Sequence, residues 1–94
     1  MDPIQVFRKI EREIDWELTI IVGHESNGVG FLVRIDKVHW EELTGGRHPP
    51  EDLVRRSFVF LLRKKKSVFT IPRNFNIRDI QKQFAEYEDE MKKR

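Results

Sequence analysis

The chain has 94 residues, no cysteine and a formal net charge of +2, with 38% hydrophobic and 36% charged residues. This length supports a single domain over residues 1–94, because two domains would leave neither half enough residues for a core. The missing cysteines exclude a disulfide-stabilised fold and thiol chemistry. No apolar run approaches the roughly 20 residues of a membrane span, and the N-terminus lacks a signal-peptide pattern. We therefore expect a small soluble cytoplasmic domain that does not interact with membranes.

The first expected element is an amphipathic helix over residues 3–14. Asp2 would cap its N-terminus, and Pro3 suits the first helical position, where a missing N–H costs nothing. Four apolar residues recur at helical spacing and would share one face: Ile4, Phe7, Ile10 and Ile14. A strand or a loose arm is the alternative for this terminus.

Residues 16–22 and 29–38 are predicted to form an antiparallel β-hairpin. Hydrophobic residues alternate along both segments, which is typical of strands with one buried face. Asn27-Gly28 is the strongest turn signal between them, because both central residues of a type I′ turn need a positive φ.

The turn and the apolar pattern agree on one register for this hairpin. A two-residue turn would place Val22 opposite Val33. Ile20 would then lie opposite Ile35, and the apolar faces of both strands would coincide, whereas a slip of one residue would turn one face to solvent. Gly30 leaves room for a bulge, which would lengthen the loop.

Residues 36–43 admit two interpretations. Either the second strand continues, or a short helix forms and ends at Gly45-Gly46. Residues 44–50 are a loop by composition, since glycine and proline are frequent there.

Two helices are predicted next, over about residues 50–64 and 77–92. The first has a broad apolar arc with basic residues on the opposite side. The second begins after Asn76, a good N-cap, with Asp79 as its capping-box partner. Apolar residues then recur at helical spacing along the second helix: Ile77, Ile80, Phe84, Tyr87 and Met91.

Together these elements predict an α+β domain with an N-terminal helix, an antiparallel hairpin and two or three helices packed on one sheet face. Two strands alone bury too little apolar surface. Either residues 67–71 add a third strand, or two chains pair. Ile21 and Leu32 on the outer hairpin face, together with Trp40, favour pairing and hence a homodimer.

Two motifs stand out between Pro50 and Glu90. The first is the run from Glu51 to Leu62, and the second runs from Phe75 to Glu88. They resemble a family of short bacterial proteins of about 90 to 110 residues, the size of one domain. In that family a strand pair precedes a helix with the pattern P-E-x-L-V-R-x-S-F-x-F-L-L, and a second helix closes on Tyr-Glu.

The chain departs from this family pattern at two places. Arg63–Lys66 is a basic run where mixed charges are expected, and Ala85 stands where proline is expected. The resemblance supports the architecture and implies neither an activity nor functional residues.

Charge is unevenly distributed along the chain. Residues 1–50 carry a net charge of −3, and residues 51–94 carry +5. From Arg55 to Lys82, nine basic residues accompany a single acid, Asp79, which gives +8 over 28 residues. Such a segment is either a partner-binding face or a solvated surface.

One helix face within this segment is the candidate partner-binding site. It combines four basic residues with an apolar residue of the kind that interfaces use: Arg55, Arg56, Val59, Arg63 and Lys66. Nucleic-acid binding needs such a positive face, often with aromatic residues for stacking. An acidic protein surface fits the same face at least as well, and acids near the two ends of the chain could neutralise it.

The sequence names no catalytic, cofactor-binding or metal-ligating residue. The histidines at positions 24, 39 and 48 lack the spacing of a zinc motif, and no serine lies in a nucleophile elbow. We therefore expect a non-enzymatic protein-interaction module without a cofactor. The alternative is a nucleic-acid-binding domain that uses the basic helix face. A second alternative is a small enzyme with a site at the loop between His39 and His48.

Overall fold

The structure is a computed structural model, and it describes residues 4–23, 28–65 and 67–93. Its elements follow in the order β1 (Ile4–Glu11), β2 (Asp15–Val22), β3 (Val29–Asp36), α1 (Lys37–Thr44), α2 (Pro50–Lys65), the 3₁₀ turn η1 (Val68–Thr70), β4 (Asn74–Asn76), α3 (Arg78–Gln83) and α4 (Tyr87–Lys92). Some residues with a role expected from the sequence lie outside the described ranges: Asp2, Pro3, His24, Asn27 and Lys66.

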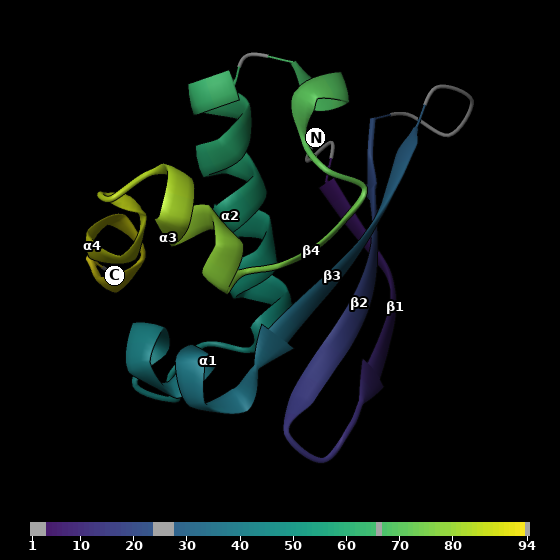
Figure 1. Cartoon of the computed structure of the whole chain (residues 1–94). Coiled ribbons are helices and arrows are strands. Elements are labelled where there is room, and N and C mark those ends of the chain that lie inside the picture. Colours follow the sequence, from purple (N-terminus) through teal and green to yellow (C-terminus); the bar gives the residue numbers. More distant parts are fainter. Residues whose placement is uncertain (1–3, 24–27, 66, 94) are drawn as a thin grey trace.

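The strands form one mixed sheet in the order β1-β2-β3-β4, in which only the pair β3-β4 is parallel. The helices lie on one side of this sheet (Figure 1). An α+β architecture is therefore confirmed. No helix in the described part of the chain is long and apolar enough to span a membrane.

The expected N-terminal helix over residues 3–14 is wrong, because residues 4–11 form the edge strand β1. Of the apolar residues that predicted a helix, Ile4 is buried, but Phe7 is 72% and Ile14 is 70% exposed. Pairing with β2 overrides the helical spacing, since β2 would otherwise present a row of unpaired backbone groups along its outer edge.

β1 pairs antiparallel with β2 and contains a bulge. Ile4 lies opposite Val22, and the register shifts between Val6 and Arg8, at Phe7. A bulge adds one residue to one strand and bends that strand locally. The side chain of Val6 packs against the core, whereas that of Phe7 is exposed.

The two predicted hairpin strands are confirmed as β2 and β3, although the second ends at Asp36 rather than at residue 38. The ambiguous residues 36–43 mostly belong to helix α1. Gly45 adopts the left-handed conformation, with φ at 65°, and its N–H donates to the carbonyl of Glu41. This glycine therefore ends the helix, as the helical one of the two interpretations expected.

The hairpin register differs from the prediction. Val22 lies opposite Val29 rather than Val33, and Ile20 lies opposite Phe31. Six residues rather than two therefore connect the strands. The shift of four positions is even, so the same side chains still face the core.

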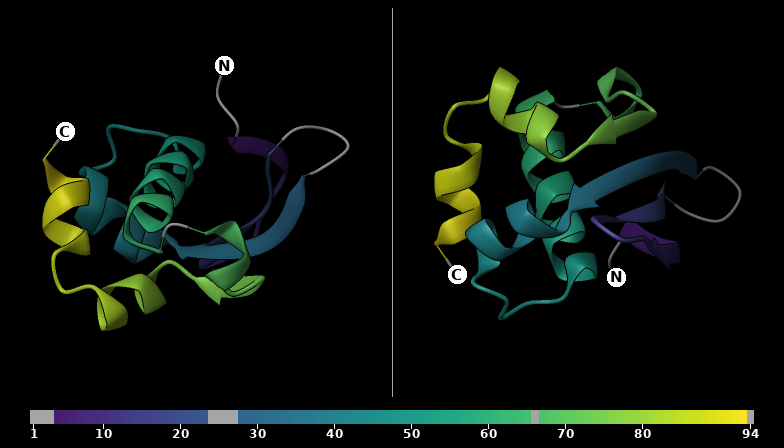
Figure 2. Two further views of the ribbon diagram at one scale, coloured as in Figure 1. Left: turned by 90° about the horizontal axis from the view of Figure 1, so that it is seen from above. Right: turned by 60° about the horizontal axis from the view of Figure 1, so that its bottom comes forward.

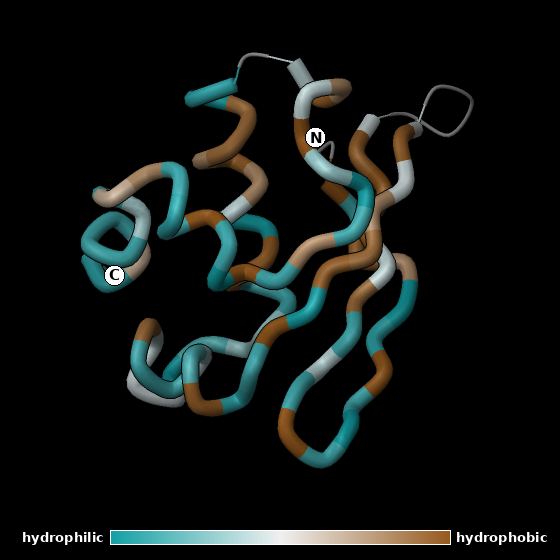
Figure 3. Tube along the Cα trace, viewed as in Figure 1, coloured by the Kyte–Doolittle hydropathy of each residue, from teal (hydrophilic) through white to brown (hydrophobic). Residues whose placement is uncertain are grey.

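The predicted helix over residues 50–64 is confirmed as α2, which covers the inner face of the sheet. Hydrophobic residues recur along α2 and along the central strands (Figure 3). Phe58 is fully buried, and its ring centroid lies 5.1 Å from that of Phe31 and 6.0 Å from that of Phe75. These rings join α2 to two strands of the sheet.

The extra strand proposed within residues 67–71 is wrong, because Val68–Thr70 forms the 3₁₀ turn η1. The added strand lies further on, at β4, where Phe75 pairs with Val33 in the parallel direction. Pro72 separates the turn from the strand, as expected for a residue that cannot donate to a central ladder.

The predicted helix over residues 77–92 is two short helices, α3 and α4. Phe84 between them is extended, with φ at −130° and ψ at 98°, and its ring packs edge-to-face on Phe60 at 5.7 Å. The side-chain oxygen of Gln81 accepts the N–H of Glu88 at 2.9 Å. These contacts stabilise the interruption between α3 and α4.

The predicted cap at Asn76 and Asp79 is confirmed. The side-chain oxygen of Asn76 accepts the N–H of Arg78 at 2.9 Å, and the Asp79 carboxylate accepts the N–H of Asn76 at 3.1 Å. Two backbone donors at the start of α3 are thereby satisfied.

Asp36 joins the start of α1 to β4 and α3. Its carboxylate accepts the Arg78 Nε–H at 2.7 Å and an Asn76 Nδ2–H at 3.1 Å. These contacts, that of Arg78 foremost, hold the pKa of Asp36 below its ordinary value. A lowered pKa in the folded state stabilises the fold above the unfolded pKa of about 3.9, and this stability is lost as the pH falls through the folded pKa.

Replacement of Asp36 by alanine is expected to lower the free energy of unfolding at pH 7 by about 1–2 kcal/mol, since hydrogen bonds to a charged group are lost. Urea unfolding at pH 7 and at about pH 3 measures this loss, which should shrink at the lower pH. Asp89→Ala, at an exposed position on α4, is the control. Equal effects of both substitutions at pH 7 would contradict this role for Asp36.

Candidate functional site

A groove of about 480 Å³ lies between α2 and α4. Four residues that the sequence predicted as a binding face line it together: Arg55, Arg56, Val59 and Arg63. They share one side of α2, as their helical spacing requires, and Arg55 at the edge of this side donates its Nε–H to the carbonyl of Ile4 in β1 at 3.4 Å. The fifth predicted residue, Lys66, lies outside the described residues.

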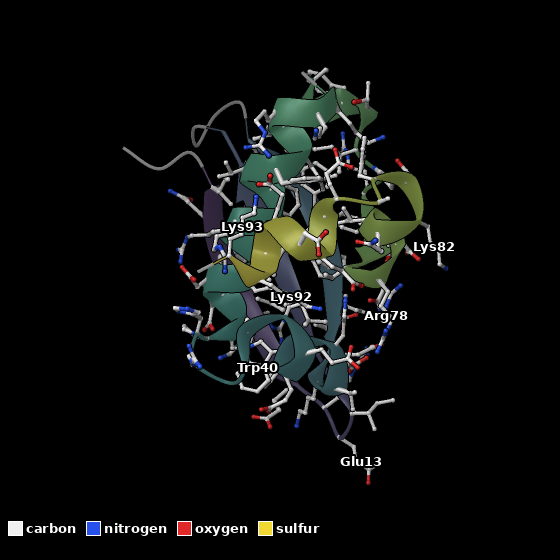
Figure 4. The ribbon with its side chains drawn as sticks, turned by 90° about the vertical axis from the view of Figure 1, so that its left-hand side faces the viewer. Glu13, Trp40, Arg78, Lys82, Lys92 and Lys93 are labelled. Atoms are coloured by element: carbon white, nitrogen blue, oxygen red, sulfur yellow. The ribbon has the colours of Figure 1, made fainter. Side chains whose placement is uncertain are left out.

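α4 supplies a second wall that the sequence did not single out. Its region contributes three lining residues: Glu90, Met91 and Lys93. Figure 4 shows α4 lying across α2, with Lys93 beside α2. The amphipathic spacing of Met91 was visible in the sequence, but the break at Phe84 that sets the direction of α4 was not.

The floor of the groove is apolar. Val59 projects from α2 with 55% of its surface exposed, while Phe60 and Met91 are 2% and 5% exposed. A partly exposed valine beside buried apolar side chains offers contact area to an apolar group of a ligand.

The rim of the groove is mainly basic. Four cationic residues (Arg55, Arg56, Arg63 and Lys93) face two acidic ones (Asp52 and Glu90), which gives a net charge of +2. Arg63 lies 3.3 Å from the Glu90 carboxylate, and its guanidinium lies 5.5 Å from the centroid of the Phe60 ring. Arg63 thus bridges the two walls while 57% of its side chain remains exposed.

A buried hydrogen bond holds α4 on α2. Tyr87 is fully buried, and its hydroxyl lies 2.6 Å from Ser57 Oγ. Ser57 Oγ also lies 2.7 Å from the carbonyl of Leu53. Because the carbonyl can only accept, the Ser57 proton goes to Leu53, and the Tyr87 hydroxyl donates to Ser57.

Burial raises the pKa of Tyr87 well above its ordinary value, because the ionised phenolate would lose its hydration. A raised folded pKa stabilises the fold below the unfolded pKa of about 10, and that stability is lost as the pH rises beyond it. Since Tyr87 is the only tyrosine, its phenolate absorbance should not appear near pH 10 while the chain is folded. It should appear only together with unfolding, as followed by circular dichroism.

The urea-unfolded chain is the control for this titration, with an expected midpoint near pH 10. The variant Tyr87→Phe should lose about 1 kcal/mol at pH 7 and part of the decline in stability at alkaline pH. A midpoint near pH 10 in the folded protein would contradict the buried position of Tyr87.

Two further contacts position α4. His39 on α1 is fully buried, and its Nε2 lies 3.2 Å from Oε2 of Glu88. Arg56 Nη2–H donates to the carbonyl of Met91 at 2.6 Å. Helix α4, the second wall of the groove, is therefore attached to both α1 and α2.

The remaining basic residues of the charged segment mostly form ion pairs away from the groove. Lys64 lies 2.6 Å from a Glu86 carboxylate oxygen. Arg78 lies 2.7 Å from the Asp36 carboxylate, and Lys82 lies 3.4 Å from that of Asp79. Both basic residues belong to α3, on the other side of α4 from Lys93 (Figure 4). The segment is therefore not one continuous basic face.

His39 and His48 have different surroundings, since His39 is fully buried. His48 lines a depression of about 190 Å³ at the loop between α1 and α2, which His39 does not line. The ring of His48 lies 4.0 Å from Asp52. Among the described residues, no group of three or more histidine, aspartate or glutamate side chains could hold a metal ion.

No family model matches the chain, and searches among curated proteins and solved structures likewise find no match. The resemblance of residues 50–90 to a short bacterial family therefore stays a prediction. The geometry of the groove is the basis for a functional proposal.

Proposed function

We propose that this chain is a small non-enzymatic protein-interaction module whose groove between α2 and α4 binds an acidic segment of a partner protein. The observation that carries the proposal is the combination of an apolar floor with a mainly basic rim in one open groove. Interfaces combine these two features, with apolar contacts at the centre and polar groups around them.

The rim favours carboxylates as ligands. Arg55, Arg56 and Arg63 come from one helix face, and guanidinium groups bind carboxylates through paired hydrogen bonds. The net charge of +2 adds attraction to an acidic partner, which raises the association rate and disfavours basic partners.

The floor favours a peptide with apolar side chains over a purely ionic ligand. Val59, which is 55% exposed, can shed water against an apolar anchor, which is how interfaces gain most of their free energy. The expected ligand therefore carries apolar residues on one face and acidic residues beside them.

The ion pairs of the charged segment weigh against nucleic acid as the ligand. Lys64, Arg78 and Lys82 are already close to carboxylates outside the groove. Asp52 and Glu90 interrupt the basic rim, which suits a peptide with few carboxylates better than a nucleic-acid backbone with a phosphate at every nucleotide. Nucleic-acid binding through the basic helix face remains the alternative that the experiment distinguishes.

The test uses a fluorescein-labelled synthetic peptide of about 15 residues with leucines at helical spacing and glutamates beside them. We expect anisotropy to report a dissociation constant of about 10–100 µM, weakened by added salt. The matched control replaces every glutamate by lysine and should not bind. The proposal fails if both peptides bind equally or if neither binds, and steep salt-dependent binding of a mixed oligonucleotide would favour the alternative.

We also propose that the protein is cytoplasmic. This rests on the composition, since a chain without cysteine needs no oxidising compartment to fold.

A further inference from the structure

The sheet has a second face, opposite the helices, that none of the described elements covers (Figure 2). Residues on this face alternate with the buried residues of the core. Ile21 lies between the buried Ile20 and Val22, and Leu32 lies between two buried residues of β3. Both side chains are only partly buried, although the helices pack closely on the other face.

β1 extends this apolar surface. Phe7 lies at the bulge, between the inward-facing Val6 and Arg8, which pairs with the outer-face residue Thr19, and it is 72% exposed. Ile10 pairs with Glu17, an outer-face residue of β2, and is 38% exposed. Four apolar residues from three adjacent strands thus share this outer face: Phe7, Ile10, Ile21 and Leu32.

The charges on the outer face largely cancel. Glu17 and Arg34 lie opposite each other on β2 and β3, and the Arg34 Nη1–H donates to the side-chain oxygen of Asn74 at 2.6 Å. Arg8, opposite Thr19, leaves a net charge of about +1 on the face. A strongly charged partner gains little here, whereas a second copy of the same face meets little repulsion.

The size of the face suits a weak dimer. Three strands of eight residues and the short β4 span roughly 26 Å by 15 Å, from the usual rise and strand spacing. Contact over that area buries on the order of 1,000 Å² in total, at the lower end for specific association.

We propose that the outer face packs against the same face of a second copy, which makes a two-fold homodimer with two sheets face to face. The apolar residues of β1, β2 and β3 form the centre of this interface. The groove between α2 and α4 lies on the helix side, so dimerisation leaves it open and does not depend on the proposed ligand.

Trp40 takes no part in this interface, although the sequence suggested it for pairing. Its ring packs edge-to-face on Trp16 at a centroid distance of 5.2 Å, and its Nε1–H donates to the carbonyl of His48 at 2.7 Å. It therefore belongs to the helix side of the sheet.

Sedimentation equilibrium over a wide range of protein concentrations tests the dimer. The average mass should rise from 11.4 kDa toward twice that value, with a dissociation constant of about 10–100 µM. Phe7→Glu should raise this constant at least about tenfold, because the carboxylate would be buried against apolar side chains. Ile21→Thr keeps a β-branched side chain and should raise it several-fold.

Phe69→Glu is the matched control, since Phe69 is 75% exposed but lies in η1 at the other edge of the sheet. It should leave the dissociation constant unchanged. Thermal unfolding of each variant at low concentration separates loss of the dimer from loss of the fold. A wild-type chain that stays at 11.4 kDa at millimolar concentration, or equal effects of Phe7→Glu and Phe69→Glu, would overturn the proposal.

Discussion

Replacement of Phe58 by alanine is expected to lower the free energy of unfolding by about 3–5 kcal/mol. Phe58 is fully buried, and its ring packs between Phe31 of β3 and Phe75 of β4. The substitution removes the aromatic contact that joins α2 to both strands and leaves a cavity between them. A domain of this size has only about 5–14 kcal/mol in total, so the variant should be marginally folded at 37 °C.

Urea unfolding followed by circular dichroism measures this loss. Phe69→Ala is the control, because it removes the same ring from a side chain that is 75% exposed, and its effect should stay within about 0.5 kcal/mol. If Phe58→Ala cost no more than this control, the packing of α2 on the sheet would be wrong.

Reversal of two charges on the groove rim is expected to weaken binding of the acidic peptide about 30-fold or more. The double variant Arg63→Glu/Lys93→Glu changes the charge of the groove from +2 to −2, with one substitution on each wall. It replaces two attractions to the ligand by two repulsions, each worth about 1 kcal/mol or more. Fluorescence anisotropy with the glutamate-containing peptide measures the change.

The double variant Arg73→Glu/Lys82→Glu is the matched control. It reverses two exposed charges of the same basic segment that do not line the groove, so the net charge of the chain changes equally. We expect a loss of less than about threefold, since screened charges at a distance contribute little. Similar losses in both double variants would show that total charge, and not the groove, governs binding.

Local signals in the sequence predicted the elements that depend on local chemistry. The alternation of β2 and β3, the helix α2 and the cap at Asn76 with Asp79 all follow from side-chain spacing and nearby hydrogen bonds. The hairpin register was wrong by an even number of residues, because the apolar pattern fixes which face is buried but not the length of the loop.

Tertiary contacts decided the elements that the sequence did not predict. β1 has helical spacing, but it completes the sheet beside β2 instead. Ala85 favours helix and gives no signal of the break at Phe84. That break depends on the contact of Phe84 with Phe60 on α2, which lies far away in sequence.

In the candidate site, too, local sequence signals predict one part, and tertiary contacts decide the other. The α2 half of the groove was predictable, because Arg55, Val59 and Arg63 share one helix face at a spacing of four. The α4 half was not, because its position depends on the buried hydrogen bond between Tyr87 and Ser57. A polar pair within two apolar helix faces is the sequence feature that could have indicated that these helices pack together.

An NMR titration of the isotopically labelled protein with the glutamate-containing peptide tests the groove as a binding site most directly. We expect the largest amide shifts in residues 52–63 of α2 and 90–93 at the end of α4, while the outer sheet face is unaffected. The lysine-containing peptide should cause no such shifts. Saturating shifts confined to other surfaces, or equal shifts with both peptides, would contradict the groove between α2 and α4 as the binding site.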